Sequence, residues 1–417
     1  MKVLHVITGL DAGGAEIQLA MLVAHTRHQA DVVTLYNPGP VAERIRAEGT
    51  AVRDIGMGRN TDLTALLKLR RMIRAGRYDV VHTHLYRSQI YARPAARLAG
   101  VPVVLTTEHS IGETHIERRK MSAGVRALYL ASELFSDATI AVSGVVRERL
   151  VKWGVPGRKI TVIPNGVDVA SLAFRPELRE QVRQQFGIGA GTYVIGALGR
   201  LDPQKRVDLM MEAAAPVLGD QCKILVIGRG EDQDRLEAAA ARLGVADHVI
   251  FGGFQSDTQA MMAAFDLYVA ASRQETFGLS VLEALASGLP VLYTTCPALD
   301  GIQTARARQV EGTPAALGEL IRQEVEAGPR PRAADSEVLG HYGMESVARR
   351  IDDLYEEILA HRPRRVRAAA ARRRAPAAQA APAAQAAPAA QAAPMASAVP
   401  EVSAAPEVSA AGPAGAG

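Results

Sequence analysis

The strongest constraint on the fold is a repeated alternation of short apolar runs with amphipathic segments. The first part of the chain contains the runs KVLHVIT, ADVVTLY, DVVHTHL, VPVVLTT and ATIAVS, separated by helical patterns such as DLTALLKLRRMIRAG. After residue 190 the rhythm restarts with YVIGALG, KILVIG, HVIFGGF, DLYVAAS and PVLYTT. Near-continuous apolar strands that alternate with amphipathic helices predict parallel sheets covered by helices on both faces. Two such series predict an α/β protein with two doubly wound, Rossmann-like domains that face a cleft.

The loop residues in VIPNGVD mark the expected boundary between these domains. We therefore expect an N-terminal domain over residues 1–168 and a C-terminal domain over residues 169–360. The last helix of the second domain, about residues 341–360, is a candidate to pack back on the first domain. Residues 361–417 begin with an arginine-rich stretch and continue as APAAQA repeats, a composition that predicts a disordered tail.

The charge of the chain is concentrated in this tail. The whole chain carries +4, while the tail holds seven arginines and two glutamates, a net +5, so residues 1–360 carry −1. The tail has no aromatic residue for base stacking, and we therefore expect a solvated basic linker and no nucleic-acid partner.

The cysteine content and the N-terminal sequence indicate the cellular compartment of the protein. Cys222 and Cys296 are the only cysteines, and both lie in apolar stretches, which predicts reduced core thiols. The sequence MKVLHVITGLDAGGAE has a short, strand-like apolar run followed by glycines, unlike a secretory leader. Both features predict a cytoplasmic protein.

A glycine loop follows the first apolar run, in TGLDAGGAEIQLA. Gly13 and Gly14 allow the backbone to approach a ligand closely, and the start of a helix near Ala15 favours a phosphate. The spacing differs from the G-x-G-x-x-G dinucleotide fingerprint. A purely structural turn remains an equally good interpretation of this loop alone.

Two cations follow the first run of the second series, in GRLDPQKRVDLMMEAA. Arg200 and Lys205 flank a predicted strand-to-helix junction at the carboxyl edge of the second sheet. An arginine can bind a diphosphate bidentately and a lysine binds it as a point charge. An exposed loop that happens to carry both cations is the alternative.

Two glutamates eight positions apart occur in ETFGLSVLEALASGLPV. Glu275 lies at the end of a predicted strand and Glu283 within the following helix. A carboxylate that leaves water needs partners. Gly278 permits close approach, so the amides around Phe277 and Leu279 can face a ligand, and two carboxylates that face hydroxyl groups are typical of sugar recognition.

These segments together resemble the retaining glycosyltransferases of family 4, which have the two-domain GT-B fold. The similarity is carried by GRLDPQKRVDLMMEA, ILVIGRGEDQDRLEAAAARLGVADHVIFGGF and ASRQETFGLSVLEALASGLPV, with GGAE and VIPNGVD in the expected order. It covers about residues 2–295 and is most specific in the C-terminal half.

The resemblance implies roles for the donor side. Arg200 and Lys205 match the pair that holds the donor diphosphate, and Glu275 and Glu283 match the E-x7-E motif. Within that motif Glu275 would hold hydroxyls of the transferred sugar and Glu283 the ribose. Further positions that the resemblance assigns to donor binding are Gly13, Gly14, Phe277, Gly278 and Leu279.

On the other side of the site, His109 in LTTEHS matches the family histidine near the donor sugar. HTHLYRSQI resembles the acceptor-side strand end, with His84 and Arg87 as candidates for acceptor contact. From the residues alone, His82 and His84 are equally well explained as core or loop histidines. After Thr295 the sequence departs from the family, because the usual glutamate is absent from LYTTCPALDGIQT.

The implied reaction moves a hexosyl unit from a sugar nucleotide to an acceptor hydroxyl with retention. UDP-sugars are the favoured donors and GDP-mannose is next. No Asp-x-Asp stretch sits at a strand end, so we expect neither a metal nor another cofactor. The alternatives are a sugar-nucleotide 2-epimerase and a non-catalytic nucleotide-sugar-binding partner in a glycosylation complex.

The segment HIERRKMSAGVRALYLASELF, residues 115–135, has a helical pattern with a broad apolar set beside Arg118, Arg119, Lys120 and Arg126. An ordinary helix packed on the first sheet is one interpretation. The other is peripheral contact with an anionic membrane, since many acceptors of the family are lipid-linked, while others are polysaccharides.

Overall fold

The computed structural model describes residues 1–371 except Ala12, Asn60, Arg118, Arg365, Arg367 and Ala369. Met1–Ala375 form one compact unit. Most of the predicted tail, residues 372–417, lies outside the described residues. Within them, every helix is too short or too polar to cross a bilayer.

The first parallel sheet has seven strands in the order β3-β2-β1-β4-β5-β8-β9. Its strands are β1 (Lys2–Ile7), β2 (Gln29–Thr34), β3 (Ala51–Asp54), β4 (Val80–His84), β5 (Val103–Glu108), β8 (Ala138–Ala141) and β9 (Ile160–Val162). The central strands β4 and β5 are buried along their whole length, as expected for strands covered by helices on both faces.

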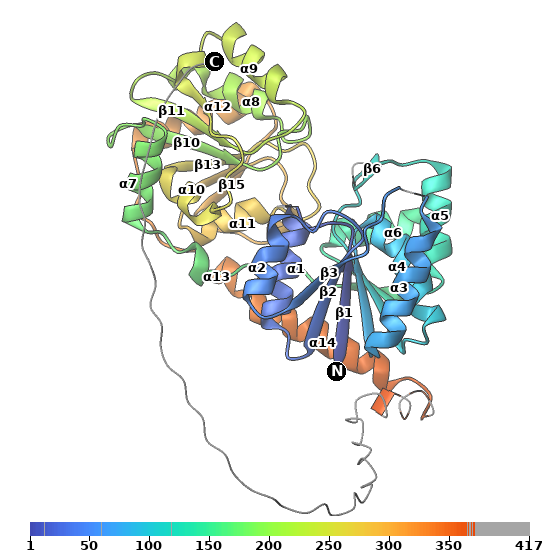
Figure 1. The fold of residues 1–417 in the computed structure, drawn as a ribbon. Coiled ribbons are helices and arrows are strands. Elements are labelled where there is room, and N and C mark those ends of the chain that lie inside the picture. The colour runs from blue at the N-terminus through green and yellow to red at the C-terminus, as the bar shows by residue number, and fades with distance from the viewer. Residues whose placement is uncertain are drawn as a thin grey trace, which may run out of the picture. The chain divides into compact units, whose positions relative to one another are not determined.

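Helices cover this sheet (Figure 1). They are α1 (Gly14–His25), α2 (Gly39–Ala47), α3 (Leu63–Gly76), α4 (Tyr86–Leu98), α5 (Ala123–Glu133) and α6 (Gly144–Trp153). The single helix suggested by the pattern of residues 115–135 is wrong at its start. A small antiparallel hairpin of β6 (His115–Ile116) and β7 (Arg119–Lys120) comes first, and the helix begins at Ala123, where the Ser122 side chain accepts from the amide of Val125.

The second parallel sheet has six strands in the order β12-β11-β10-β13-β14-β15. Its strands are β10 (Tyr193–Leu198), β11 (Cys222–Ile227), β12 (Val249–Phe251), β13 (Leu267–Ala270), β14 (Val291–Tyr293) and β15 (Ala307–Gln309). Both cysteines are buried free thiols, which confirms their prediction as core residues.

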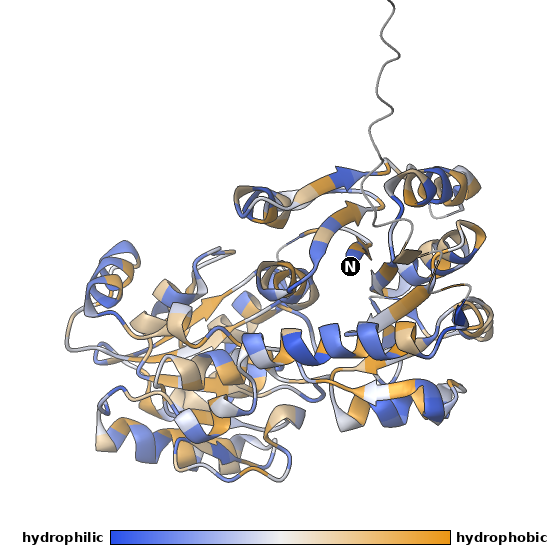
Figure 2. Cartoon of the chain, turned by 90° about the horizontal axis from the view of Figure 1, so that it is seen from below, coloured by the Kyte–Doolittle hydropathy of each residue, from blue (hydrophilic) through white to orange (hydrophobic). Residues whose placement is uncertain are grey.

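Further helices surround this sheet. They are α7 (Pro176–Gln185), α8 (Val207–Ala214), α9 (Gln233–Arg242), α10 (Thr258–Ala264), α11 (Leu279–Ala286), α12 (Pro314–Ala327) and α13 (Ser336–Gly340). Short 3-10 turns connect several elements: Gly157–Lys159, Ala170–Leu172, Ala215–Val217, Ala246–His248 and Pro297–Leu299. In Figure 2 the strands are mainly orange while the helices carry both colours, the pattern of amphipathic helices packed on apolar sheets.

The last long helix, α14 (Met344–Ala360), packs on the first sheet. Its residues Val347, Ile351 and Tyr355 share a buried cluster with Val3 and Val103. Figure 1 shows α14 running along the N-terminal sheet, far in sequence from the strands it covers. The chain thus returns from the second sheet to complete the first one.

The folded body continues past the expected boundary at residue 360. The Arg362 guanidinium donates to the Pro102 carbonyl at 2.9 Å and pairs with Asp137. The arginine-rich composition predicted solvent exposure at this position, but an acidic partner on the first domain holds this arginine.

The strand order reverses at one place in each sheet, between β1 and β4 in the first and between β10 and β13 in the second. Such reversals leave a crevice at the carboxyl ends of the strands, where ligands of doubly wound proteins bind. The predicted site residues should therefore be sought directly after these four strands.

Candidate active site

The cations expected at the second reversal follow β10. Lys205 donates to Glu275, which follows β13, with Nζ 2.6 Å from Oε1. Burial alone would lower the pKa of Lys205, but the charge and hydrogen bond of Glu275 outweigh it, so the pKa is raised and the lysine stays charged. Arg200 is half exposed and its Nε lies 2.9 Å from Asp202 Oδ2. Both cations thus lie at the same strand end, and each has an acidic partner.

Gly278 closes the end of the loop that begins at Glu275. Its φ of +101° is a left-handed conformation, and a Cβ there would lie 2.5 Å from Cys296 Sγ, so only glycine fits. Gly278 is the N-cap of α11 and provides no side chain to cap it, which leaves the first amides of the helix available to an anion. Leu279 is the first residue of that helix.

Phe277 lies beneath this turn and is 3% exposed. Its ring packs edge-on against Tyr342 with centroids 5.5 Å apart, and its carbonyl accepts from the Ala298 amide at 2.9 Å. Phe277 is therefore a buried side chain that stabilises the turn before α11. The unusual segment after Thr295, through Cys296 and Ala298, supplies that support.

Glu283 lies one turn into α11 and completes the acidic pair. Burial raises its pKa to about 7, and the nearby positive charge of Lys205 opposes this rise. Lys205, Glu275 and Glu283 therefore share one electrostatic environment. The two glutamates of this otherwise apolar segment thus have different surroundings: Glu275 is paired with Lys205, and Glu283 is a carboxyl whose pKa is raised by burial.

The glycine loop after β1 meets α11. A Cβ on Gly14 would lie 3.3 Å from the Leu279 side chain, whereas Gly13 is the N-cap of α1 and lies beside Glu16. Both glycines thus lie at the N-terminus of α1, with Gly14 in contact with the donor-side helix. The predicted donor-binding residues of the two domains therefore lie close together.

Sequence reasoning missed two further links to the Glu275 loop. Ser143, the N-cap of α6, donates from Oγ to the Thr276 carbonyl at 2.7 Å. The Arg149 guanidinium donates to the Glu275 carbonyl at 3.4 Å and to the Ile111 carbonyl at 3.2 Å. A serine at a helix start and an arginine within a helix are too common to have indicated these contacts.

On the first sheet, His84 ends β4 and His109 follows β5. His84 Nδ1 lies 3.3 Å from His109 Nε2, and burial lowers the pKa of both imidazoles, that of His109 to about 4. His84 is only 2% exposed, so it lies beneath His109 and not at the surface. Arg87 differs: its guanidinium stacks 4.6 Å from the centroid of the Tyr36 ring.

The histidines next to His84 could hold a metal by residue type. One ligating atom from each of His5, His82 and His84 lies within 4.8 Å of the others. However, His82 already contacts the Tyr355 hydroxyl at 2.6 Å and the Thr107 hydroxyl at 2.7 Å. An ion would have to replace these hydrogen bonds, so the cluster fits a hydrogen-bonded core better, and the expectation of a metal-free site remains a prediction.

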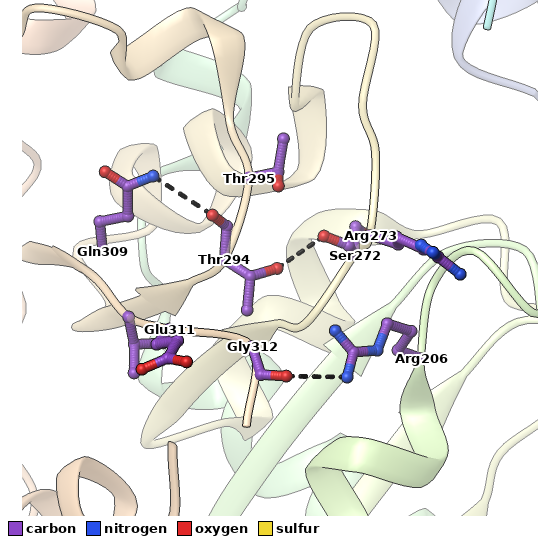
Figure 3. A pocket seen from close by; sticks show the side chains of 9 residues that line it. Arg206, Ser272, Arg273, Thr294, Thr295, Gln309, Glu311 and Gly312 are labelled. Atoms are coloured by element: carbon purple, nitrogen blue, oxygen red, sulfur yellow. Dashed lines mark hydrogen bonds between the residues drawn. The ribbon is translucent and has the colours of Figure 1, made fainter. Parts of the chain in front are cut away.

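Two pockets lie at the carboxyl edge of the second sheet. One is lined in part by Arg200, Lys205 and Tyr268. The other, of about 490 Å³, is lined by polar residues that follow β13, β14 and β15 (Figure 3). In it the Arg206 guanidinium donates to the Gly312 carbonyl at 2.9 Å, so this arginine is held in place beside Lys205.

Comparison with known proteins decides the family. Residues 12–171 match the description Glycosyltransferase Family 4, and residues 179–324 match Glycosyl transferases group 1. A D-inositol 3-phosphate glycosyltransferase 1 of Catenulispora acidiphila is 30% identical over 376 residues, which are 80% of this chain and 87% of the relative. The chain belongs to glycosyltransferase family 4.

Other relatives agree with this family 4 assignment. A UDP-Gal:alpha-D-GlcNAc-diphosphoundecaprenol alpha-1,3-galactosyltransferase of Escherichia coli is 29% identical over 242 residues, 56% of this chain and 62% of the relative, less than two thirds of its length. The crystal structure of Anabaena Alr3699/HepE in complex with UDP has a TM-score of 0.73 at 21% identity, covering 86% of this chain and 100% of that one. This likeness confirms the predicted GT-B fold, with two Rossmann-like domains.

Proposed function

We propose that this family 4 protein transfers a hexosyl unit from a nucleoside diphosphate sugar to an acceptor hydroxyl with retention at the anomeric carbon. The observation that carries the proposal is the arrangement of Lys205, Glu275 and Glu283 around the uncapped start of α11. It combines a fixed cation and free helix amides for a diphosphate with two carboxylates for hydroxyl groups.

In the reaction the bond between the anomeric carbon and the diphosphate oxygen breaks, and a bond from the acceptor oxygen to that carbon forms on the same face. The leaving phosphate takes the acceptor proton. Negative charge grows on the diphosphate as its bond breaks, and Arg200 and Lys205 stabilise it, a contribution of about 3 to 4 kcal/mol to the barrier for one such charge. Donor and acceptor supply all the atoms, and no metal or other cofactor takes part in the proposed step.

UDP-sugars are the favoured donors, with GDP-mannose next. UDP is present in the Anabaena structure, and the Escherichia coli relative is named for UDP-galactose. The latter name includes a diphosphoundecaprenol acceptor, which supports a lipid-linked or polysaccharide acceptor here and a place in the synthesis of cell-surface polysaccharide or glycolipid. A cytoplasmic location with peripheral contact to the inner membrane face fits such an acceptor.

Release of UDP or GDP from a panel of sugar nucleotides tests the proposal. With a suitable acceptor, release of one nucleoside diphosphate is expected, and the product should keep the anomeric configuration of the donor. A 2-epimerase would instead convert the sugar without an acceptor. Tight binding of a sugar nucleotide with no release for any acceptor would favour the non-catalytic partner.

A further inference from the structure

Three histidines form a hydrogen-bonded chain that ends at His109. His5 Nδ1 on β1 lies 3.2 Å from His84 Nε2, and His84 Nδ1 lies 3.3 Å from His109 Nε2. The rings are also nearly parallel, with interplanar angles of 29° and 28°. The middle histidine thus uses both of its nitrogens, one toward the interior and one toward the candidate site.

The first two of these histidines are shielded from water. His5 is 1% exposed and His84 is 2% exposed. Burial lowers the pKa of His5 to about 3 and that of His84 below its usual range, so both rings are neutral at pH 7. A neutral imidazole has one N–H donor and one acceptor nitrogen.

Neutral rings in this order restrict where the protons can lie. Each nitrogen-to-nitrogen contact needs one proton, and each ring supplies one. Only two arrangements satisfy both contacts: all three protons lie on the Nδ1 atoms, or all three lie on the Nε2 atoms. The proton on His109 is therefore coupled to the proton on His84, and through it to His5.

The backbone fixes the position of His84, the middle one of the three histidines. Leu85, directly after His84, has φ +70° and ψ 152°, an unfavourable conformation for a residue with a side chain. The Ser88 hydroxyl donates to the carbonyls of His84 and Leu85. Such strain persists only where the surroundings enforce it, so the position of His84 is firmly determined.

At the far end of the three histidines, His109 Nδ1 makes no hydrogen bond of ordinary geometry within the described residues. This nitrogen is buried although the ring as a whole is partly exposed, and the nearby Asn165 side chain opposes the lowering of the His109 pKa by burial. A buried nitrogen without a partner is costly unless a ligand satisfies it. A substrate hydroxyl can act as donor or acceptor and suits either tautomer.

We propose that His84 and His5 are positioning residues that couple the tautomer of His109 to their own and hold its ring in one orientation, so that its Nδ1 is presented to a substrate hydroxyl. The proposal deepens the proposed transferase function and rests on it, since His109 is assigned to the donor-sugar side. In this proposal His84 acts through His109 and does not contact the acceptor directly.

Two amide substitutions of His84 separate its two contacts. The amide of asparagine reaches the position of Nδ1, so His84→Asn keeps a partner for His109 and loses the one for His5. The amide of glutamine reaches the position of Nε2, so His84→Gln does the reverse. His82→Gln is the matched control, because His82 is a buried histidine on the same strand whose bonds go to Tyr355 and Thr107.

The measurement is imidazole 15N NMR of the full-length protein labelled at histidine, with His109 assigned by its loss in His109→Gln. His84→Gln, which removes the partner of His109, should change the ratio of the two His109 tautomers relative to the wild type, whereas His84→Asn and His82→Gln should leave the ratio close to that of the wild type. Turnover in His84→Gln should fall between about tenfold and a hundredfold, with the donor KM changed less than about twofold. His84→Asn should recover most of this loss.

An unchanged His109 tautomer in His84→Gln overturns the proposal. So does an equal change in the His82→Gln control, because that outcome shows a general packing effect. The NMR result does not depend on turnover. A wild type with no transferase activity but with a tautomer controlled by His84 would therefore refute the function and leave the coupling standing.

Discussion

Lys205 Nζ and Glu275 Oε1 are 2.6 Å apart, so the cation expected to bind the donor diphosphate is paired with the carboxylate expected to bind the donor sugar. A donor must compete with this pair for both partners. The pair joins the ends of β10 and β13, the two strands at the reversal of the second sheet. It thus keeps both side chains in position when no donor is bound.

The first prediction concerns the lysine. Lys205→Ala should lower turnover at least a hundredfold, because the growing charge on the leaving diphosphate loses a fixed partner. Lys205→Arg, which keeps the charge, should retain more activity than Lys205→Ala. Steady-state kinetics measures both, and circular dichroism checks that the variants are folded. Near-wild-type turnover in folded Lys205→Ala would refute its role at the diphosphate.

The second prediction separates the two glutamates by ligand. Glu283→Gln should weaken the binding of free UDP or GDP, because a ribose hydroxyl donates more strongly to a carboxylate than to an amide. Glu275→Gln should change that binding little but impair use of the intact sugar nucleotide. Calorimetry with the free and the sugar-bearing nucleotide tests this, and equal losses for free nucleotide in both variants would contradict the assignment.

A third prediction follows from the raised pKa of Glu283, about 7 in the folded protein against an ordinary value of 4.5. A folded-state pKa above the unfolded one means that the fold loses stability as pH rises from 4.5 to 7, by up to about 3 kcal/mol. Glu283→Gln removes this loss. The variant should therefore melt at a higher temperature than the wild type at pH 8 and at nearly the same temperature at pH 4.5.

The control for this third prediction is Glu275→Gln, which removes a glutamate that is paired with Lys205 in the same region. That variant should not gain stability at pH 8, since it leaves the lysine without its partner. Scanning calorimetry at both pH values is the measurement. A difference between wild type and Glu283→Gln that is independent of pH would show that titration of this residue is not the cause.

The fourth prediction concerns the turn before α11. Gly278→Ala should destabilise the protein by about 1 to 3 kcal/mol, because alanine is strained at φ +101° and its Cβ would overlap Cys296 Sγ. Adding Cys296→Ala should recover the part of the loss that is due to overlap, but not the part that is due to the backbone. Denaturant melts of the single and double variants measure both parts. Full recovery in the double variant would show that the backbone conformation costs nothing.

Much of the fold could be predicted because the central strands are buried on both faces. Every apolar run named from the sequence forms a strand, and the runs at the two reversals carry the predicted site residues. The strands that the pattern missed in the two large sheets are β3, β9 and β15. All three are short: β3 is exposed along most of its length, and β9 and β15 are exposed after their first residue. They lie at sheet edges, where no apolar run is required.

The candidate site was predictable only where a residue type is rare in its setting. Glutamates in an apolar segment, and paired glycines before a helix, indicated their positions from the sequence alone. The contact between Ser143 and Thr276, or the order of the three histidines, depends on how distant strands align. The family resemblance of HTHLYRSQI predicts His84 on the acceptor side, but the alignment of β1, β4 and β5 brings it between two other histidines.

The fifth prediction concerns a membrane surface beside α5. Leu128 is 55% exposed and Leu134 is 80% exposed, unusual for large apolar side chains, and Lys120 and Arg126 are exposed close by in the sequence. Apolar side chains next to cations are typical of surfaces that bind anionic lipid. Full-length protein should therefore float with anionic vesicles at low salt and less at moderate salt.

Variants assign this vesicle binding to α5. Leu128→Ser with Leu134→Ser should reduce flotation severalfold, because the buried apolar contact with lipid is lost. Leu63→Ser is the matched control, since Leu63 is 75% exposed on α3, away from these cations in the sequence. Truncation after residue 371 should weaken binding further, because it removes Arg372, Arg373 and Arg374. Each arginine contributes about 1 kcal/mol near an anionic surface. These three residues, like Arg118, lie outside the described residues. Full-length protein that stays in the soluble fraction at low salt would contradict the membrane contact and favour a soluble acceptor.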